Sequence, residues 1–198
     1  MKTKQVQPTL YGGPTSPFAR MTKIYGEVLG ANFTYEQIDI YSAEFIDQFN
    51  PLRQIPTMFA DDMAIFDSRT IFEYFENSTG HKTNKTDFQQ ATRISLALGM
   101  TDACLQYRME MMLPEDERNV ARISKLKARM GRCVEHLEAW ADLITEGEIR
   151  LEQIVIACAL EYLDFRYTSD WRRDCTALDA WVQVFSERTD MQQTRPVG

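Results

Sequence analysis

The first helix of this chain is predicted to begin within the segment TSPFAR, Thr15–Arg20. Ser16 is a favoured N-cap residue, and Pro17 suits the first helical position, where a missing N–H costs nothing. Apolar residues then recur with helical spacing as far as Gly30, a typical helix stop. A short apolar segment, Thr9–Tyr11, and a Gly-Gly-Pro turn come before the helix. The order strand, turn, helix therefore places a serine hydroxyl at a helix N-terminus, where unpaired N–H groups favour an anion.

Strand and helix signals alternate through the first part of the chain, in the order β-α-β-α-β-β-α. Strand-helix-strand units imply parallel pairing, and a hairpin adds antiparallel strands. The order therefore predicts a mixed four-stranded sheet with helices on both faces. After the first helix, the elements are expected at 32–40 (strand), 42–50 (short helix), 57–60 and 63–66 (hairpin strands) and from Asp67-Ser68 onward (helix).

The second part of the chain has only helical patterns. Residues 77–87 lack apolar groups and are predicted to be a linker. One later segment is apolar on nearly all sides, which is typical of a buried central helix, and the polar tail at 189–198 is predicted to be loose. The fold class is therefore α/β plus all-α, with domains at 1–80 and 87–198. Helices are expected at 88–112, 115–144 and 151–167 (the apolar one), and one or two shorter helices at 171–185.

Composition narrows the classes of function. The chain has 198 residues and a net charge of −7, from 22 basic and 29 acidic residues, which disfavours a nucleic-acid partner. Without an apolar run of membrane-spanning length or a secretory signal, we expect a cytoplasmic protein with no membrane partner. The four cysteines form no Cys-x-x-Cys motif and the two histidines lie far apart, so we predict no metal site, dithiol motif or Ser-His-Asp triad.

Three separated segments together resemble the cytosolic glutathione transferases, most closely the serine-type bacterial members. They read SPFAR, NPLRQIPT and DSRTIFEY, at Ser16–Arg20, Asn50–Thr57 and Asp67–Tyr74. A fourth segment, Ala157–Arg166, resembles the buried helix of their second domain. The resemblance implies a thioredoxin-like N-terminal domain, an all-helical C-terminal domain, a homodimer, and glutathione as co-substrate.

The resemblance also implies a role for Ser16, the predicted catalytic residue. In serine-type members the matching hydroxyl donates a hydrogen bond to the glutathione sulfur. An ordinary thiol has a pKa of about 8.5, and such a bond at a helix N-terminus lowers it. The serine keeps its proton, so it needs no general base. Thr15 is a nearby alternative donor and Tyr11 a more distant one.

The other two segments are expected to hold the rest of glutathione. The Ile55–Pro56 bond is cis in the thioredoxin-like fold, which presents the backbone of Ile55 to a peptide that adds like a strand. Ser68 is expected to bind the γ-glutamyl carboxylate through its hydroxyl and N–H, and Asp67 to accept from the γ-glutamyl ammonium.

Arg53 and Gln54 depart from the family pattern, which commonly has glycine and lysine at these positions. The lysine lies near the glycine carboxylate of glutathione. Gln54 can still donate a neutral hydrogen bond there, and Arg53 either replaces the missing charge or points to solvent.

The leading hypothesis is a glutathione transferase that conjugates the thiolate to a small hydrophobic electrophile. The electrophile is expected against the first long helix. The alternative is a non-catalytic binding protein of the same fold, like the stringent-starvation partners of RNA polymerase, which the change at Arg53 and Gln54 keeps open. Glutaredoxin-like exchange is disfavoured because no cysteine lies near Ser16. The candidate electrophile-site residues are Met100, Cys104, Tyr107 and Arg108.

Overall fold

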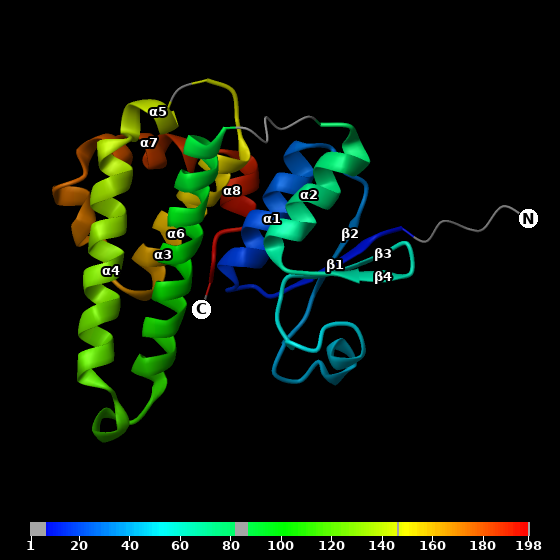
Figure 1. Ribbon diagram of the computed structural model, residues 1–198, viewed down its shortest axis with the longest axis horizontal. Helices are drawn as coiled ribbons and strands as arrows, with labels where there is room; N and C mark the ends of the chain where they lie inside the picture. Colours follow the sequence, from blue (N-terminus) through cyan, green and yellow to red (C-terminus); the bar gives the residue numbers. More distant parts are fainter. Residues whose placement is uncertain (1–6, 82–86, 146, 198) are drawn as a thin grey trace, which may run out of the picture. The chain divides into compact units, whose positions relative to one another are not determined.

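The structure of the protein is a computed structural model that describes residues 7–81, 87–145 and 147–197 (Figure 1). Its described residues divide into two units, one within 1–84 together with 194–198 and the other within 85–193. The domain limits 1–80 and 87–198 stay a prediction. They differ from these units at the chain end, because the prediction places residues 194–198 in the second domain and the structure groups them with the first unit.

A four-stranded mixed sheet forms the centre of the first unit, in the order β2-β1-β3-β4. β1 pairs parallel with β2 and antiparallel with β3, and β3 pairs antiparallel with β4. This confirms the thioredoxin-like arrangement. The strands are β1 (Thr9–Gly12), β2 (Thr34–Gln37), β3 (Thr57–Ala60) and β4 (Met63–Ile65), and the helices are α1 (Pro17–Val28), the short 3-10 helix η1 (Glu44–Gln48) and α2 (Ser68–Thr79).

The two faces of this sheet are covered differently. One face packs on α2 through a buried apolar cluster that includes Leu10, Met58, Ile71 and Phe75. On the other face, aromatic rings from the strands meet rings from η1 and the residue that follows it. The ring centroids are 5.3 Å apart for Tyr11 and Phe45, 6.5 Å for Phe45 and Phe49, and 5.0 Å for Phe49 and Phe59. The expected helix at 42–50 is therefore a 3-10 helix over the second face.

The β3–β4 hairpin turns through Asp61 and Asp62, which have φ angles of 50° and 60°. Positive φ at both central residues is the type I′ turn, in which Gly is favoured at the second position. We expect Asp62→Gly to raise the free energy of unfolding by about 0.5–1 kcal/mol, because glycine adopts this conformation without steric cost. Urea denaturation measures the change. Asp61→Gly is the control. Glycine relieves the positive φ at this position too, but the substitution also removes the hydrogen bond between Asp61 and Tyr74, which offsets the gain in stability. A less stable Asp62→Gly protein would contradict the prediction.

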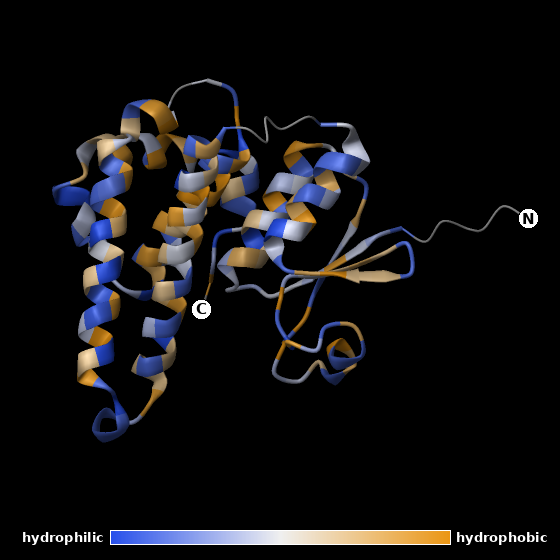
Figure 2. Ribbon diagram, in the orientation of Figure 1, coloured by the Kyte–Doolittle hydropathy of each residue, from blue (hydrophilic) through white to orange (hydrophobic). Residues whose placement is uncertain are grey.

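Every regular element in the described part of the second unit is a helix, as expected. Every residue from Glu152 to Leu160 is buried, which confirms a buried central helix. α4 shows alternating apolar and polar bands, in keeping with one buried and one exposed side (Figure 2). The elements are α3 (Phe88–Met112), η2 (Glu115–Glu117), α4 (Val120–Ala139), α5 (Ala141–Thr145), α6 (Leu151–Arg166), η3 (Asp170–Arg173), α7 (Thr176–Phe185) and α8 (Thr189–Gln193).

Two helical predictions were wrong. The single helix expected at 115–144 is divided into η2, α4 and α5, because the Asn119 side chain caps a new helix by accepting from Arg122 N–H at 3.0 Å. The tail expected to be loose contains α8, in which Met191 is fully buried. One buried methionine in five residues gives no periodic signal, so the sequence pattern missed it. None of the helices among the described residues combines the length and apolar character needed to cross a membrane.

Candidate functional site

The strand register brings three separated segments to one edge of the sheet. Tyr11 of β1 lies opposite Thr57 of β3, and Met58 of β3 lies opposite Ile65 of β4. Since β1 and β4 both run antiparallel to β3, their carboxyl ends flank the start of β3. The turn after β1, the loop before β3 and the start of α2 therefore meet there. These segments carry the predicted site residues Ser16, Arg53, Gln54, Ile55, Pro56, Asp67 and Ser68.

Gly13 is the point where the first two segments touch. A Cβ atom at Gly13 would lie 2.8 Å from Cδ1 of Ile55, so only glycine fits without a shift. The Gly13 carbonyl also accepts from the Ser16 N–H at 3.2 Å. The turn that leads into α1 is thereby held directly against the loop that contains Ile55.

Ser16 is the N-cap of α1, as predicted. Its Oγ accepts from the Ala19 N–H at 3.2 Å, and Ser16 is half-buried. Because the oxygen acts only as acceptor in this cap, the hydroxyl proton stays available, and no described residue accepts it. The first turn of α1 contains no acidic residue, so no side chain there offsets the positive end of the helix. The arrangement can donate a hydrogen bond to an anion.

Tyr11, one of the two alternative hydrogen-bond donors to the glutathione sulfur, packs its side chain against η1. Its ring packs edge-on against Phe45 on the opposite face of the sheet from the buried α2 cluster. Burial, and then the charge of Glu36, raise the pKa of Tyr11, so its hydroxyl is a poorer proton donor than usual. Thr15 lies in the turn before Ser16 and stays the nearer alternative.

The Ile55–Pro56 peptide is cis, as expected. Pro56 is buried and Ile55 is half-buried. Among the described residues, neither the N–H nor the C=O of Ile55 has a hydrogen-bond partner. Backbone groups left unpaired in this way can take up an extended peptide as an additional strand.

Asn50 holds this loop in shape and was not singled out by the sequence analysis. Its side chain is buried, at 1% exposure. Its amide donates to the Gln54 carbonyl at 3.1 Å and to Thr57 Oγ1 at 2.8 Å, and its Oδ1 accepts from the Leu52 N–H at 3.0 Å. Thr57 Oγ1 in turn donates to the Gln54 carbonyl at 2.7 Å. An asparagine directly before a proline was the available sequence signal, since such pairs favour turns.

Arg53 and Gln54 lie at the exposed rim of the loop. Arg53 has a φ of 49°, the backbone region that favours glycine, and its Nε lies 3.4 Å from Asp47 Oδ1. Both of these side chains are more than 40% exposed, so the pair contributes little to stability. The Gln54 side-chain amide has no hydrogen-bond partner among the described residues and is available to a ligand.

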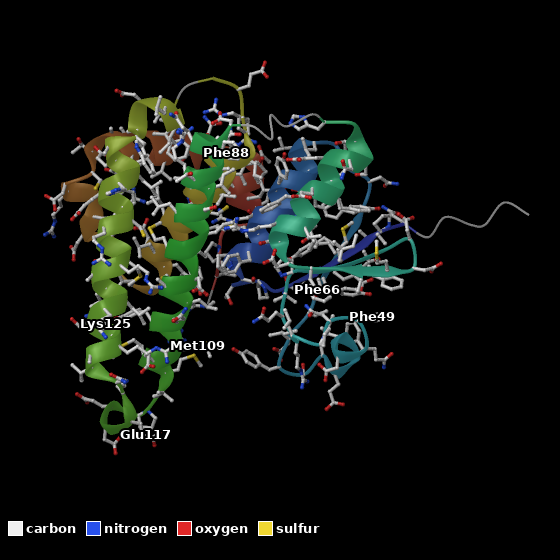
Figure 3. All side chains as sticks on the ribbon, viewed as in Figure 1. Phe49, Phe66, Phe88, Met109, Glu117 and Lys125 are labelled. Atoms are coloured by element: carbon white, nitrogen blue, oxygen red, sulfur yellow. The ribbon has the colours of Figure 1, made fainter. Side chains whose placement is uncertain are left out.

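Asp67 and Ser68 form the start of α2, beside Phe66, which lies between β4 and this helix (Figure 3). Asp67 is the N-cap, and its Oδ1 accepts from the Arg69 N–H at 3.0 Å. Its other carboxylate oxygen has no hydrogen-bond partner among the described residues. Ser68 is buried, at 5% exposure, and within the described part of the chain its hydroxyl is likewise unpartnered. Asp67 can therefore accept a hydrogen bond from an ammonium group, and the Ser68 hydroxyl can donate one to a carboxylate.

The candidate electrophile-site residues all lie on α3 in the second unit. Met100 and Cys104 are fully buried there and Tyr107 nearly so, which makes them packing residues. Burial raises the pKa of Cys104 to about 12, so its thiol is unreactive. Arg108 is half-exposed. Nowhere in residues 7–81, 87–145 and 147–197 do three potential metal-ligating side chains gather.

The sequence model of the glutathione S-transferase N-terminal domain matches residues 15–78. An uncharacterized glutathione-S-transferase-like protein of Escherichia coli K12, YibF, is 28% identical over 94% of this chain and 98% of its own length. A stringent starvation protein A homolog of Coxiella burnetii is 28% identical over 74 residues, which are 37% of this chain and 35% of that protein.

Solved structures of glutathione transferases are similar to this structure over nearly the whole chain. A glutathione transferase family member from Pseudomonas fluorescens Pf-5, with bound glutathione, has a TM-score of 0.86 and 28% identity, and the match covers 97% of this chain and all of that one. A structure of a family member from the same strain contains S-(propanoic acid)-glutathione. Residues 15–78 therefore match the glutathione S-transferase N-terminal domain, and the chain with its mixed sheet and helical second unit is similar to glutathione transferases over nearly its whole length.

Proposed function

We propose that the protein is a serine-type glutathione transferase. The Ser16 hydroxyl donates to the sulfur of glutathione and favours its thiolate, and the thiol proton leaves to solvent. The thiolate then attacks an electrophilic carbon of a small hydrophobic acceptor, forming a C–S bond as a leaving group departs or a double bond is saturated. The observation that carries the proposal is Ser16 itself, whose oxygen caps α1 and whose proton remains free.

The remaining site residues hold the ends of the tripeptide. The unpaired backbone of Ile55, next to Pro56, receives the central part of glutathione as an added strand. Ser68 and the free carboxylate oxygen of Asp67 bind the γ-glutamyl end, while Gln54 donates to the glycine end without charge. Arg53 stays paired with Asp47 at the surface. The bound glutathione of the Pseudomonas relative supports glutathione as the ligand.

The thioether in the second Pseudomonas structure is the type of product that conjugation would form. By resemblance to the family, we also propose that the protein acts as a homodimer in the cytoplasm, with no metal.

Two measurements test the proposal. Glutathione should raise the melting temperature, because a ligand at one hundred times its Kd stabilises the folded state by about 2.7 kcal/mol. The protein should also conjugate glutathione to an aryl halide such as 1-chloro-2,4-dinitrobenzene. Failure of both measurements refutes the transferase assignment.

The partial match to a stringent starvation protein A homolog favours one second candidate, a non-catalytic interaction protein of the same fold. The matched segment is about a third of each chain, and Arg53 and Gln54 alter the expected glutathione loop. A protein of this kind should give no melting shift with glutathione and no conjugation. The same two measurements therefore separate the candidates.

A further inference from the structure

The segment between β2 and β3, residues 38–56, borders the candidate site in the first unit. It begins at the carboxyl end of β1, where the Ile38 N–H donates to the Gly12 carbonyl at 2.8 Å, and it ends at the Ile55–Pro56 peptide. η1 and the loop that follows it lie below the sheet in Figure 1. A bound peptide that extends beyond Ile55 on the side of η1 therefore meets this segment.

The orientation proposed above for the tripeptide decides which of its ends lies there, so this step rests on the proposed function. The start of α2 takes the γ-glutamyl end, and Ile55 takes the centre. After Ile55 the chain runs through Pro56 into β3, whose neighbour β4 leads to α2. Before Ile55 it runs back through Gln54 and Arg53 towards η1. The glycine end of the tripeptide is therefore the end that lies against residues 38–56.

Acidic side chains outnumber basic ones in this segment. All of its charged residues are exposed. Residues 38–56 contain three acids, Asp39, Glu44 and Asp47, and one base, Arg53. Exposed charges act on one another within a Debye length, about 10 Å at 0.1 M salt. The segment therefore repels a carboxylate brought close to it, unless Arg53 is available to bind that carboxylate.

The charge of Arg53 is already used within the segment. Its Nε lies 3.4 Å from Asp47 Oδ1. Its backbone N–H donates to the Asn50 carbonyl at 2.9 Å, so the loop fixes the point from which this side chain extends. A ligand carboxylate placed beside the pair would share the guanidinium with Asp47, which leaves it no net positive charge. The next residue, Gln54, offers an exposed amide that hydrogen-bonds without charge.

We propose that the site selects against a free carboxylate at the glycine end, so that its preferred thiol co-substrate is a γ-glutamylcysteinylglycine whose glycine end is an amide. The side-chain amide of Gln54 donates to the carbonyl of such an end and accepts from its N–H. No charge then has to be placed beside the three acids. Gln54 is thus the residue that determines specificity at this end of the peptide, and Arg53 is not.

The binding test compares glutathione with glutathione amide by isothermal titration calorimetry on the whole protein. The two peptides differ only in the glycine carboxylate, which the second carries as a carboxamide. We expect the amide to bind about threefold more tightly at about 20 mM salt, and the two to bind equally at about 0.5 M, because salt screens the repulsion. A site with an available cation at this end would instead favour glutathione at low salt. Tighter binding of glutathione than of its amide at low salt would overturn the proposal.

Variants identify the residue that determines the preference. Gln54→Lys should shift the ratio of the two affinities by about tenfold towards glutathione, because its ammonium group binds the carboxylate. Gln7→Lys is the matched control: it makes the same change at an exposed position before β1, at the opposite end of that strand from the site, and should leave the ratio unchanged. Asp47→Asn should also shift the ratio towards glutathione, because it releases Arg53. Arg53→Gln should leave both affinities within about threefold; a larger loss for glutathione alone would show that Arg53 binds the carboxylate, against the proposal.

Conjugation of 1-chloro-2,4-dinitrobenzene with each peptide separates this inference from the proposed function. At low salt, kcat/KM should be about threefold higher with glutathione amide, while kcat should be the same with both, because Ser16 acts on the sulfur and not on the glycine end. If both peptides are conjugated but glutathione gives the higher kcat/KM, the transferase function stands and the inference fails. If the amide binds more tightly but neither peptide is conjugated, the transferase function fails and the selectivity stands. If neither peptide binds, both fail.

Discussion

Ser16→Ala is expected to lower kcat/KM for glutathione conjugation by about 10- to 100-fold, while glutathione is still retained. A hydrogen bond to a charged group contributes about 1.5–3 kcal/mol, and each 1.4 kcal/mol is a factor of ten in rate. Glutathione retention should change less, because the two ends of the tripeptide bind elsewhere. The pH profile is the diagnostic measurement: loss of the donor returns the thiol pKa toward about 8.5, so activity falls more at neutral than at alkaline pH.

Two further variants separate this effect from lost stability. Ser16→Ala also removes the cap on the Ala19 N–H, which costs about 1 kcal/mol of stability. Ser16→Asp keeps a cap acceptor but places a negative charge where the thiolate forms, so this variant should be stable and inactive. Thr15→Val should remain active. Full activity in Ser16→Ala together with loss in Thr15→Val would transfer the donor role to Thr15.

Asn50→Ala is expected to lower the free energy of unfolding by about 2–3 kcal/mol and to weaken glutathione binding by about tenfold or more. The buried amide makes hydrogen bonds to Gln54, Thr57 and Leu52. Alanine leaves these buried groups without partners and fills none of the space. Since the same bonds shape the loop that presents Ile55, affinity should fall together with stability. Urea denaturation and glutathione titration measure the two effects.

Arg53→Ala is the control in the same loop. Its exposed pair with Asp47 should contribute no more than about 1 kcal/mol, so this variant should be nearly as stable as the unaltered protein. Equal stability of Asn50→Ala and Arg53→Ala would show that the Asn50 network does not hold the loop.

The elements that were predicted well carry local signals. α1 begins after the Ser16 cap and α2 after the Asp67 cap, and both are followed by a glycine with positive φ, Gly30 or Gly80. α3 coincides with its apolar pattern at 88–112. Where the signal was weak, prediction failed: η1 is a 3-10 helix, and α8 depends on one buried residue, Met191.

The sequence by itself determined the serine hydroxyl at a helix N-terminus, because a cap is an interaction among residues three apart. It also determined that Ile55 precedes a proline and that Asp67-Ser68 begins a helix. Only the tertiary structure decided that these segments meet. The meeting depends on the register of β3 between β1 and β4, and on the contact of Gly13 with Ile55. Such pairings join residues far apart in the chain, so no local pattern encodes them.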